Sequence, residues 1–414
     1  MSKETPQSIL YLSHYYPPEV NAPAIRVSQL AKCWVEQGHK VTILTGFPNH
    51  PSGIIPPEYS GRFLQREECD GIDIIRTYMY AAPNKGFLKR ILNYLSFMFS
   101  SIVLGIPLLP KIDVVIASSP QFFVAVAGYV ISVLKRVPFV FEVRDVWPEE
   151  IVAVGAIRNR FIIGFLERVE MFLYRRAKLI VAVAQGTIEI LTSRGVPRDK
   201  IVWLPNGINM SEFRQKIDRH KIREKINLDG EFLVSYVGTH GMAHRLQTVL
   251  SAAEKLKSNS RIKFLMVGDG ADKESLLNLA QNLDLNNVTF LPQLPHEEAI
   301  GYYKISDACL VPLRKAELFT KNIPSKIYEI MASERPVLLG ARGESMELVE
   351  EAAAGLVFEP EDADSLAESI LKLYEDRNLA KQLGENGYNY AASHCRRDKI
   401  ADEYVGHLME IGGS

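Results

Sequence analysis

The chain has 414 residues, and at about 150 residues per domain this length predicts two or three domains. Hydrophobic residues make up 47% of the chain and charged residues 23%, which is typical of a folded soluble protein and excludes a disordered or fibrous one. The polar first eight residues predict no secretory signal. The four cysteines are far apart in the sequence, which argues against a disulfide scaffold or a zinc cluster and fits a reducing compartment: Cys33, Cys69, Cys309 and Cys395.

The net charge of −1 conceals a difference between the two halves of the chain. Residues 1–207 carry 23 Lys and Arg against 17 Asp and Glu, whereas residues 208–414 carry 25 against 32. The first half is therefore basic, which suits an anionic surface or ligand and gives no reason to expect a nucleic acid partner. Chance variation among solvated charges is the simpler interpretation.

The first half alternates short apolar runs with helical patterns. A helix is predicted by apolar residues at helical spacing, namely Val27, Leu30, Ala31 and Trp34. Continuous Val and Ile runs are typical of strands buried on both faces, as in a parallel sheet covered by helices. Such strands are expected at residues 8–13, 40–45, 72–77, 112–117, 138–142, 179–183 and 201–204.

The pattern restarts after residue 230, with strands expected at residues 232–238, 262–268, 287–291, 308–313, 335–340 and 355–359. The turn-rich segment 204–209 contains Pro205 and the pair Asn206-Gly207, so we place a domain boundary after residue 207. The sequence predicts an α/β protein with two doubly wound parallel-sheet domains, residues 1–207 and 208–414, whose last helix can pack back on the first domain. Ligands in such sheets bind outside the carboxyl ends of the strands, and we expect a cleft between the domains.

Residues 91–110 contain no charged side chain and follow Lys85, Lys89 and Arg90. Twenty residues can span a bilayer, but polar residues dilute this run and a strand follows at once. We therefore expect residues 85–110 to lie on a membrane surface, with the basic side chains at the lipid head groups. A helix packed in the core and a true span are the alternatives.

The segment 323–332, with the sequence IPSKIYEIMA, predicts a nucleotide-binding helix. Pro324 and Ser325 can open this helix, with Ser325 as its cap. The N-terminus of a helix favours a diphosphate, and Lys326 adds a cation there. Glu329 lies one turn along on the same face, where a carboxylate can accept both ribose hydroxyls. A capped helix with a surface ion pair is the simpler interpretation.

This segment resembles the nucleotide-binding helix of retaining glycosyltransferases of family 4, which have the GT-B fold of two facing Rossmann-like domains with a central cleft. Similar pieces occur in the family's order along the chain: residues 15–19 (YYPPE), 38–42 (GHKVT), 204–209 (LPNGIN) with Phe213, 267–270 (VGDG) and 307–312 (DACLVP). Residues 324–329 (PSKIYE), 47–51 (FPNHP) and 142–149 (EVRDVWPE) resemble the branch that builds bacterial surface polysaccharides, to which L-N-acetylfucosamine transferases of O-antigen assembly belong.

Several positions depart from the family pattern, and these departures change which residues we expect to contact the nucleotide-sugar donor. The family's first Glu, eight residues before Glu329, is Lys321 here, and Glu317 is close but out of register. The cations that relatives carry after the second domain's first strand are replaced by Thr239 and His244, so the resemblance implies that Lys326 takes over the phosphate charge. Further donor-binding positions expected from it are Gly238, Thr239, His240, Arg245, Gln293 and Leu294.

In the first domain, Glu142-Val143-Arg144-Asp145-Val146-Trp147 directly follows a strand and predicts an acceptor site. Asp145 can orient a sugar hydroxyl beside Arg144, and Trp147 can stack on a sugar ring; a loop ion pair with a core Trp is the alternative. The other candidate substrate contacts are His14, also just past a strand, Arg26, beside the Ala22-Pro23-Ala24 that replaces the family's Gly-Gly, and Glu317. Asp362-Ala363-Asp364 resembles a metal-binding DxD motif, but helix capping explains it better, and we expect no metal and no cofactor besides the donor.

The resemblance implies a retaining glycosyltransferase that moves a sugar, such as L-N-acetylfucosamine, from a nucleotide-sugar. UDP is the first expectation for the nucleotide, and GDP is the alternative. The implied acceptor is a polyprenyl-diphosphate-linked saccharide, and the implied location is the cytoplasmic face of the plasma membrane, as a peripheral protein. Two other functions stay open: a sugar-nucleotide 2-epimerase on the same fold, and a catalytically silent partner subunit.

Overall fold

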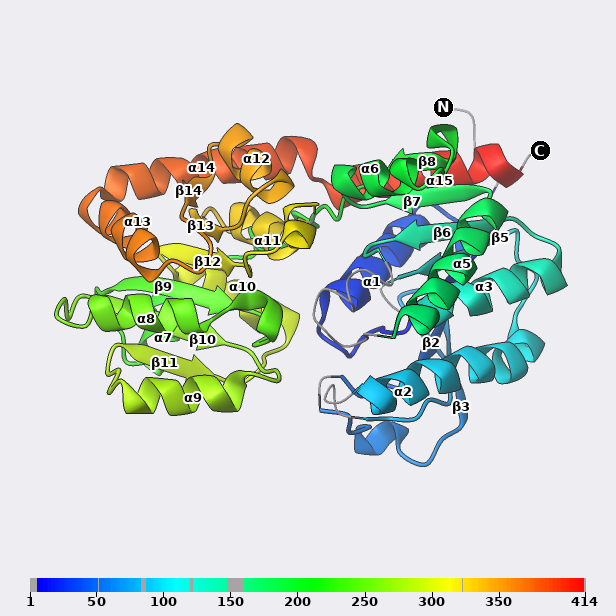
Figure 1. Ribbon diagram of the computed structural model, residues 1–414, viewed down its shortest axis with the longest axis horizontal. Coiled ribbons are helices and arrows are strands. Elements are labelled where there is room, and N and C mark those ends of the chain that lie inside the picture. Colours follow the sequence, from blue (N-terminus) through cyan, green and yellow to red (C-terminus); the bar gives the residue numbers. More distant parts are fainter. Residues whose placement is uncertain are drawn as a thin grey trace. The chain divides into compact units, whose positions relative to one another are not determined.

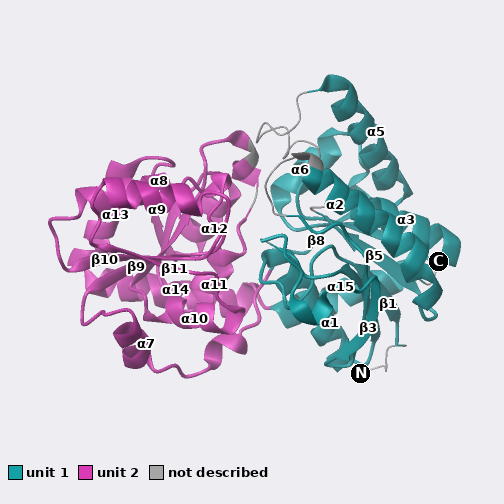
Figure 2. Cartoon of the chain, turned by 90° about the horizontal axis from the view of Figure 1, so that it is seen from below, with its two compact units in different colours: residues 1–206, 397–414 teal, residues 207–396 magenta. Residues whose placement is uncertain are grey.

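The computed structural model describes residues 6–50, 52–82, 87–119, 122–146, 159–321 and 323–412. The chain divides into two compact units (Figure 2). Unit 1 comprises residues 1–206 and 397–414, and unit 2 comprises residues 207–396. The division falls one residue before the boundary expected from the Pro and Asn-Gly pair. The last helix, α15 (Arg397–Gly412), belongs to unit 1, as the sequence analysis allowed.

The described part of unit 1 contains an eight-stranded sheet in the order β3-β4-β2-β1-β5-β6-β7-β8 (Figure 1). Neighbouring strands are parallel except for β3 and β4, which are antiparallel. The strand order reverses between β1 and β5, which makes the carboxyl ends of these two strands the switch point of the sheet. The strands are β1 (Ser8–Leu12), β2 (Lys40–Gly46), β3 (Leu64–Cys69), β4 (Ile72–Thr77), β5 (Val114–Ser118), β6 (Phe139–Val143), β7 (Leu179–Ala182) and β8 (Ile201–Trp203).

Helices cover both faces of this sheet. On one face, α1 (Ala22–Glu36) packs against α15, because the Trp34 indole donates to the Ala401 carbonyl at 3.1 Å and meets the Tyr404 ring edge-on. The other face carries α2 (Phe87–Ser100), α3 (Phe122–Lys135), α5 (Arg160–Arg176) and α6 (Gln185–Ser193). Short helical turns complete the unit: Pro57–Tyr59, Ser101–Gly105, Ile106–Leu108 and Arg198–Lys200.

The apolar run after Arg90 forms α2 and the two turns that follow it. Lys89–Leu108 is long and apolar enough to cross a membrane, yet its polar residues are tied into unit 1. Asn93 bonds to His14 and to the Tyr80 carbonyl, each at 2.8 Å, and the Ser100 hydroxyl lies 3.0 Å from the hydroxyl of Thr77. The segment is therefore a sheet-covering helix with one outward face, and Lys85 lies outside the described residues.

Unit 2 contains a six-stranded parallel sheet in the order β11-β10-β9-β12-β13-β14, with its switch point between β9 and β12. The strands are β9 (Phe232–Val237), β10 (Ile262–Val267), β11 (Val288–Leu291), β12 (Ala308–Pro312), β13 (Val337–Gly340) and β14 (Gly355–Val357). One face packs against α8 (Gln247–Lys255), α9 (Lys273–Asn282) and α13 (Ala363–Glu375), and the other against α7 (Arg219–Lys225), α10 (His296–Ile305), α11 (Lys326–Ala332) and α12 (Glu344–Glu351). Helix α14 (Arg377–His394) contributes side chains to the hydrophobic clusters on both faces of this sheet.

Candidate active site

At the switch point of unit 2, the loop after β9 meets the loop after β12. The Arg314 amide donates to the Ala243 carbonyl at 2.8 Å, and the His244 ring bonds to the Pro312 carbonyl at 3.4 Å. The loop after β10 packs equally closely, because a Cβ on Gly268, whose φ is +142°, would lie 1.9 Å from the Gly238 carbonyl oxygen. Three loops thus gather at one edge of the sheet, where ligands of this fold bind.

The side chain of Lys326 reaches this edge from the start of α11. Its Nζ lies 4.0 Å from the centre of the Tyr236 ring, is buried, and has no hydrogen-bond partner among the described residues. Burial lowers the pKa of Lys326 to about 7, and nearby Glu329 opposes that shift. A Cβ on Gly238 would lie 2.7 Å from Nζ, so a side chain at this position would displace the amine. The arrangement places a buried amine at the switch point, and none of the described residues accepts a hydrogen bond from it.

The donor contact expected at His240 stays a prediction, because neither ring nitrogen has a hydrogen-bond partner among the described residues. Its side chain is fully buried, its amide donates to the Asp269 carbonyl, and its carbonyl accepts from the Asp272 amide. Burial lowers the pKa of His240 to about 4 and that of His244 to about 3, and the charge of Lys326 acts in the same direction on both. Both rings are therefore neutral near pH 7 and supply no positive charge, and the His244 ring joins two of the loops through the Pro312 carbonyl.

The start of α11 differs in one detail from the expected cap. Ser325 occupies the N-cap position, but its side chain makes no capping hydrogen bond. Glu329 is half-buried, and its carboxylate lies against the hydroxyl of Tyr303, whose pKa is raised well above its usual range, mainly by burial and also by Glu329. The Tyr303 hydroxyl also donates to the Val237 carbonyl at 3.4 Å, so Glu329 lies beside an uncharged, buried neighbour.

The remaining donor candidates lie on the surrounding loops. Thr239 is exposed, and Arg245 forms an ion pair with Glu361 at 3.4 Å. Glu317 and Lys321 occupy the two ends of a short helix, η7 (Glu317–Lys321), the first exposed and the second half-buried. The half-buried pair Gln293 and Leu294 follows β11. Arg245 already has an acidic partner, which leaves Lys326 as the better-placed cation for a diphosphate.

In unit 1, Arg144 and Asp145 lie at the carboxyl end of β6 beside the end of β5. The Ser119 hydroxyl accepts from the Arg144 amide at 2.7 Å and from the Asp145 amide at 3.2 Å. Arg144 is buried, and burial, followed by the nearby charge of Arg26, lowers its pKa. The expected pair is thus brought together at the edge of the sheet, whereas Trp147 lies outside the described residues.

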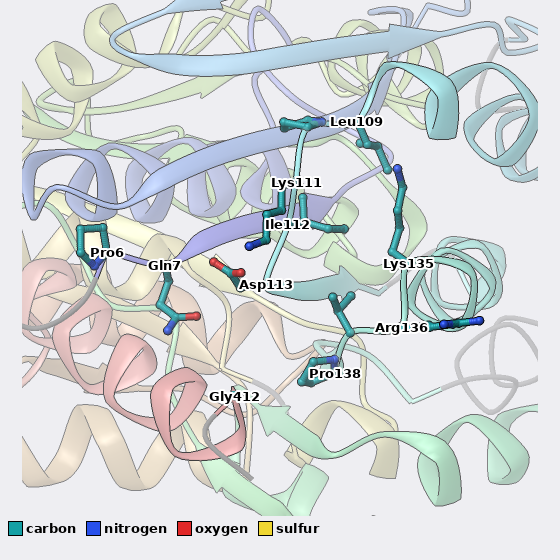
Figure 3. Close-up of a pocket in the computed structure, with 12 residues that line it drawn as sticks. Pro6, Gln7, Leu109, Lys111, Ile112, Asp113, Lys135, Arg136, Pro138 and Gly412 are labelled. Carbon is teal, nitrogen blue, oxygen red and sulfur yellow. The ribbon is translucent and has the colours of Figure 1, made fainter.

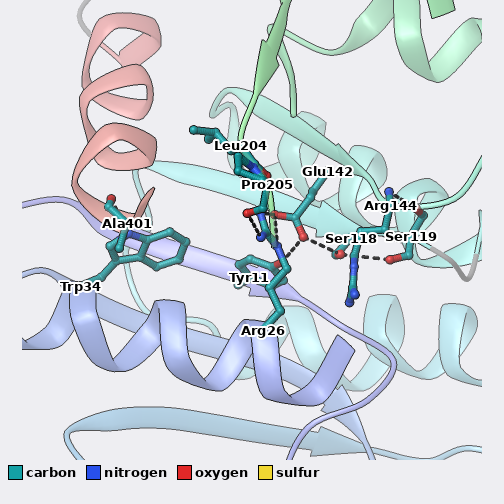
Figure 4. Close-up of polar contacts among 10 residues, drawn as sticks. All are labelled: Tyr11, Arg26, Trp34, Ser118, Ser119, Glu142, Arg144, Leu204, Pro205 and Ala401. Atoms are coloured by element: carbon teal, nitrogen blue, oxygen red, sulfur yellow. Dashed lines mark hydrogen bonds and ion pairs between the residues drawn. The ribbon is translucent and has the colours of Figure 1, made fainter. Parts of the chain in front are cut away.

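Arg26 is a structural residue and not a substrate contact. Its guanidinium pairs with the Glu142 carboxylate at 3.1 Å and donates to the carbonyls of Leu204 and Pro205 (Figure 4). Glu142 also accepts from the hydroxyls of Tyr11, at 2.6 Å, and Ser118, at 2.8 Å. Arg26 therefore joins α1, β6 and the end of the first domain within the core.

His14 is also buried, and the expected substrate contact at this residue stays a prediction, since Nδ1 has no hydrogen-bond partner among the described residues. Its Nε2 bonds to Asn93, and its ring meets Tyr15, Tyr94 and Phe97 edge-on. Burial lowers the pKa of His14 to about 3. His14 fixes α2 to the sheet.

The comparisons with known proteins agree with this geometry. A family model described as "Glycosyl transferase 4-like domain" matches residues 21–207, and one described as "Glycosyl transferases group 1" matches residues 218–390. The chain belongs to the GT-B glycosyltransferases. Together the two matches cover more than four-fifths of this glycosyltransferase, including the switch point of unit 2 and strand β5 of unit 1.

Individual relatives of this glycosyltransferase are distant. WcaI of Escherichia coli, named as a colanic acid biosynthesis glycosyl transferase, is 24% identical over 393 residues, which are 91% of this chain and 95% of the relative. Sucrose-phosphate synthase of Thermosynechococcus elongatus has a TM-score of 0.75 at 20% identity, covering 98% of both chains. HepE of Anabaena, solved with UDP-glucose, has a TM-score of 0.73 at 17% identity, covering 98% of this chain and all of HepE. These structures establish the fold.

Two resemblance motifs of this glycosyltransferase meet through Glu19, which the sequence analysis did not single out. Its carboxylate accepts from the amides of Asn49 and His50, each at 2.9 Å, and thereby joins the YYPPE segment to the FPNHP segment. Beside them lies a small pocket of about 20 Å³ that is lined in part by Tyr15, His50 and Arg90. In the sequence, the signal that could have pointed to Glu19 was the resemblance of both segments to the same family.

A larger cavity of about 710 Å³ lies at the opposite edge of the unit 1 sheet, before the amino ends of β1, β5 and β6 (Figure 3). Its charged lining includes Lys111, Lys135 and Arg136. Donor and acceptor bind at the carboxyl edge in this fold, so this cavity is not the transfer site.

Among the described residues, no three His, Cys, Asp or Glu side chains cluster around a metal position. Asp362, in the expected DxD-like segment, caps α13 by accepting from the Asp364 and Ser365 amides.

Proposed function

We propose that the chain is a retaining glycosyltransferase that uses a UDP-linked donor and a lipid-linked saccharide acceptor in surface polysaccharide assembly. The observation that carries the proposal is the buried ammonium of Lys326 at the unit 2 switch point, which has no hydrogen-bond partner in the part of the chain that the structure describes. A buried cation without a partner is unfavourable until an anion reaches it, and a nucleoside diphosphate is such an anion. The name of WcaI supports polysaccharide assembly, and the HepE complex supports UDP.

The proposed reaction breaks the bond between the sugar C1 and the β-phosphate oxygen while the acceptor oxygen bonds to C1 on the same face. The acceptor proton passes to an oxygen of the departing diphosphate. Lys326 stabilises the negative charge that grows on the β-phosphate, an interaction that is stronger in the transition state than in the ground state. Glu329 holds the ribose, and Arg144 and Asp145 orient the acceptor hydroxyl. No metal ion takes part in this proposal.

Turnover assays test this function against the alternatives. Release of UDP from a panel of UDP-sugars, with short-chain polyprenyl-diphosphate saccharides as acceptors, supports a transferase when it depends on the acceptor and persists in EDTA. Formation of a C2 epimer without an acceptor would identify a 2-epimerase. Nucleotide binding without turnover on any acceptor would instead favour a silent partner subunit. An N-acetylated deoxyhexosamine such as L-N-acetylfucosamine is the first donor sugar to test.

The outer surface of unit 1 supports a peripheral position on the cytoplasmic face of the plasma membrane. Helices α2, α3 and α5 lie side by side on one face of the sheet (Figure 1) and expose large apolar side chains, among them Phe161, which is 91% exposed. We name these residues the helical surface: Leu92, Phe99, Val103, Val133, Leu134, Phe161, Ile162, Phe165 and Phe172. Exposed apolar surface on this scale marks an interaction site.

The charges around the helical surface favour an anionic bilayer over a second copy of the chain. Helix α2 carries Lys89 and Arg90, the turn after α3 carries Arg136, and α5 carries four arginines. Glu167 and Glu170 are the acids of α5, and Glu170 is paired with Arg194 at 2.9 Å. Two copies of so basic a surface would repel, whereas anionic lipid head groups attract it.

Vesicle co-sedimentation tests the membrane proposal without reference to catalysis. The double variant Phe161→Ser and Phe165→Ser should lose most binding to vesicles that contain phosphatidylglycerol, and Lys89→Gln with Arg160→Gln should lose the preference for anionic over zwitterionic vesicles. The matched control is Ile54→Ser, because Ile54 is 73% exposed elsewhere on unit 1. Undiminished binding by the Phe double variant would refute the helical surface as the membrane contact.

A further inference from the structure

The Tyr236 ring is a rigid platform beneath the Lys326 ammonium. Tyr236 lies on β9, which pairs with β10 on one side and β12 on the other, and its side chain is fully buried. Its hydroxyl donates to the Thr239 carbonyl at 2.6 Å, so the ring cannot rotate freely. Nζ lies 4.0 Å from the ring centre, within the range of a cation–π interaction. The sequence alone gives Tyr236 no role beyond a buried strand position.

Two positive charges act on His240 beside this pair, Lys326 and Lys273, and the Lys273 ammonium is already bonded to the carbonyls of Gly268 and Leu291. The rings of His240 and His244 lie 5.8 and 5.7 Å from the Tyr236 ring, and burial keeps both imidazoles neutral. Glu329, on the same helix as Lys326, is the acidic neighbour. An ammonium has three N–H donors, and none of those on Lys326 has a partner among the described residues.

We propose that Tyr236 is a positioning residue that holds the Lys326 ammonium by its ring face and leaves the N–H donors directed to the diphosphate of the donor. This inference rests on the proposed function, because the diphosphate is the donor of that reaction. A ring face attracts the cation without using its hydrogen-bond donors. The amine therefore stays in place before the nucleotide-sugar binds. It does not have to break a hydrogen bond within the protein when the nucleotide-sugar arrives.

The proposal predicts how nucleotide affinity depends on pH. Since burial lowers the pKa of Lys326 to about 7, the amine is mostly charged below pH 7 and mostly neutral above it. A bound diphosphate favours the charged form, so binding above pH 7 takes up a proton. The affinity for UDP should therefore be greatest below pH 7 and fall as the pH rises above it. Uridine, which has no phosphate, should show no such dependence.

Calorimetric titration of the full chain with UDP and with uridine, from pH 6 to pH 9, tests the role of the ring. Tyr236→Phe keeps the ring and should stay within about twofold of the wild-type UDP affinity. Tyr236→Leu removes the ring and should weaken UDP by about tenfold at pH 7, the equivalent of about 1.4 kcal/mol. It should leave uridine unchanged. Phe264→Leu is the matched control, because Phe264 is a buried aromatic residue on β10 in the same core cluster.

A Tyr236→Leu variant that binds UDP with wild-type affinity and pH dependence would overturn the proposal. If that variant does not fold, NMR of lysine-labelled wild type decides. The Lys326 ε-methylene signal, assigned by its loss in Lys326→Arg, should be shifted upfield by the ring and should retain that shift in Tyr236→Phe. An unshifted signal in the free protein would refute the contact. Failure of the wild type to bind any nucleoside diphosphate would instead refute the proposed function, because the NMR shift does not depend on a ligand.

Discussion

The Arg26 guanidinium and the Glu142 carboxylate form an ion pair at 3.1 Å whose two side chains are 2% and 0% exposed. Both charges lie in the core of unit 1, where each requires the other, since a buried charge without a partner is strongly unfavourable. The family pattern places a glycine loop near Arg26, and that position suggested a substrate contact. The ion pair assigns Arg26 to folding and leaves Arg144 and Asp145 as the charged residues at the edge of β6.

Replacement of Arg26 by Met should destabilise unit 1 by about 3–5 kcal/mol, because the Glu142 charge would remain buried alone. All three tryptophans, Trp34, Trp147 and Trp203, belong to unit 1, so urea unfolding followed by tryptophan fluorescence reports on this unit. Arg66→Met, which removes an exposed ion pair with Asp73, is the control and should cost less than about 1 kcal/mol. Wild-type stability in Arg26→Met would contradict the structural role.

Lys326→Met should reduce turnover by about 100-fold or more, because it removes the charge that stabilises the departing diphosphate. Lys326→Arg should recover part of the rate, since a guanidinium binds phosphate but does not fit the space beside Gly238 equally well. The measurement is UDP release at saturating donor. A Met variant with wild-type turnover would remove Lys326 from the phosphate site.

Glu329→Ala should weaken UDP binding by about 1.5–3 kcal/mol, because hydrogen bonds from the ribose hydroxyls to a carboxylate are lost. Calorimetry with 2′,3′-dideoxy-UDP isolates these bonds: the variant and the wild type should bind this analogue equally. Glu368→Ala, an exposed carboxylate on α13, is the control. If Glu329→Ala weakens UDP and the dideoxy analogue by the same factor, Glu329 does not bind the ribose.

The buried His14 should make unit 1 sensitive to acid. Burial lowers its pKa to about 3, from an ordinary value of 6.5, so the unfolded chain takes up a proton below pH 6.5 that the folded chain does not. Stability is therefore lost as the pH falls from 6.5 toward 3, by up to about 1.4 kcal/mol per pH unit.

A His14→Gln variant should show a shallower loss of stability over this range in the same fluorescence assay. Glu19, whose pKa burial raises to about 7, acts in the opposite direction, so the comparison is between the variant and the wild type rather than between absolute slopes. Equal slopes in the two proteins would show that His14 is not neutral in the folded state.

Strands buried on both faces could be predicted from sequence because apolar runs carry the signal. All thirteen expected strands are present, each within a few residues of its expected bounds. The strand β3 was missed because its sequence, LQREEC, is polar and pairs only at the sheet edge. The turn that follows it did carry a signal, since Asp70 and Gly71 both have positive φ, as an Asp-Gly hairpin turn requires.

The candidate site was predictable where the motif determines the local structure, as for Lys326 and Glu329 on α11. It was not predictable where a side chain can point either way: Arg26 on α1, and His14 and His240 after strands, are all buried inside their units. Tyr236 is a candidate site residue that the sequence did not indicate. A buried strand residue gives no signal in the sequence, and only the packing of α11 brings Lys326 over its ring.

Calorimetric titration of the wild-type chain with UDP, GDP and dTDP in the presence of EDTA tests the central claim, that unit 2 holds the nucleoside diphosphate of the donor at Lys326. UDP should bind without a divalent metal ion, and Lys326→Met should weaken this binding while leaving the binding of uridine unaffected. Binding of none of the three nucleotides, or binding of UDP that is unchanged in Lys326→Met, would contradict it.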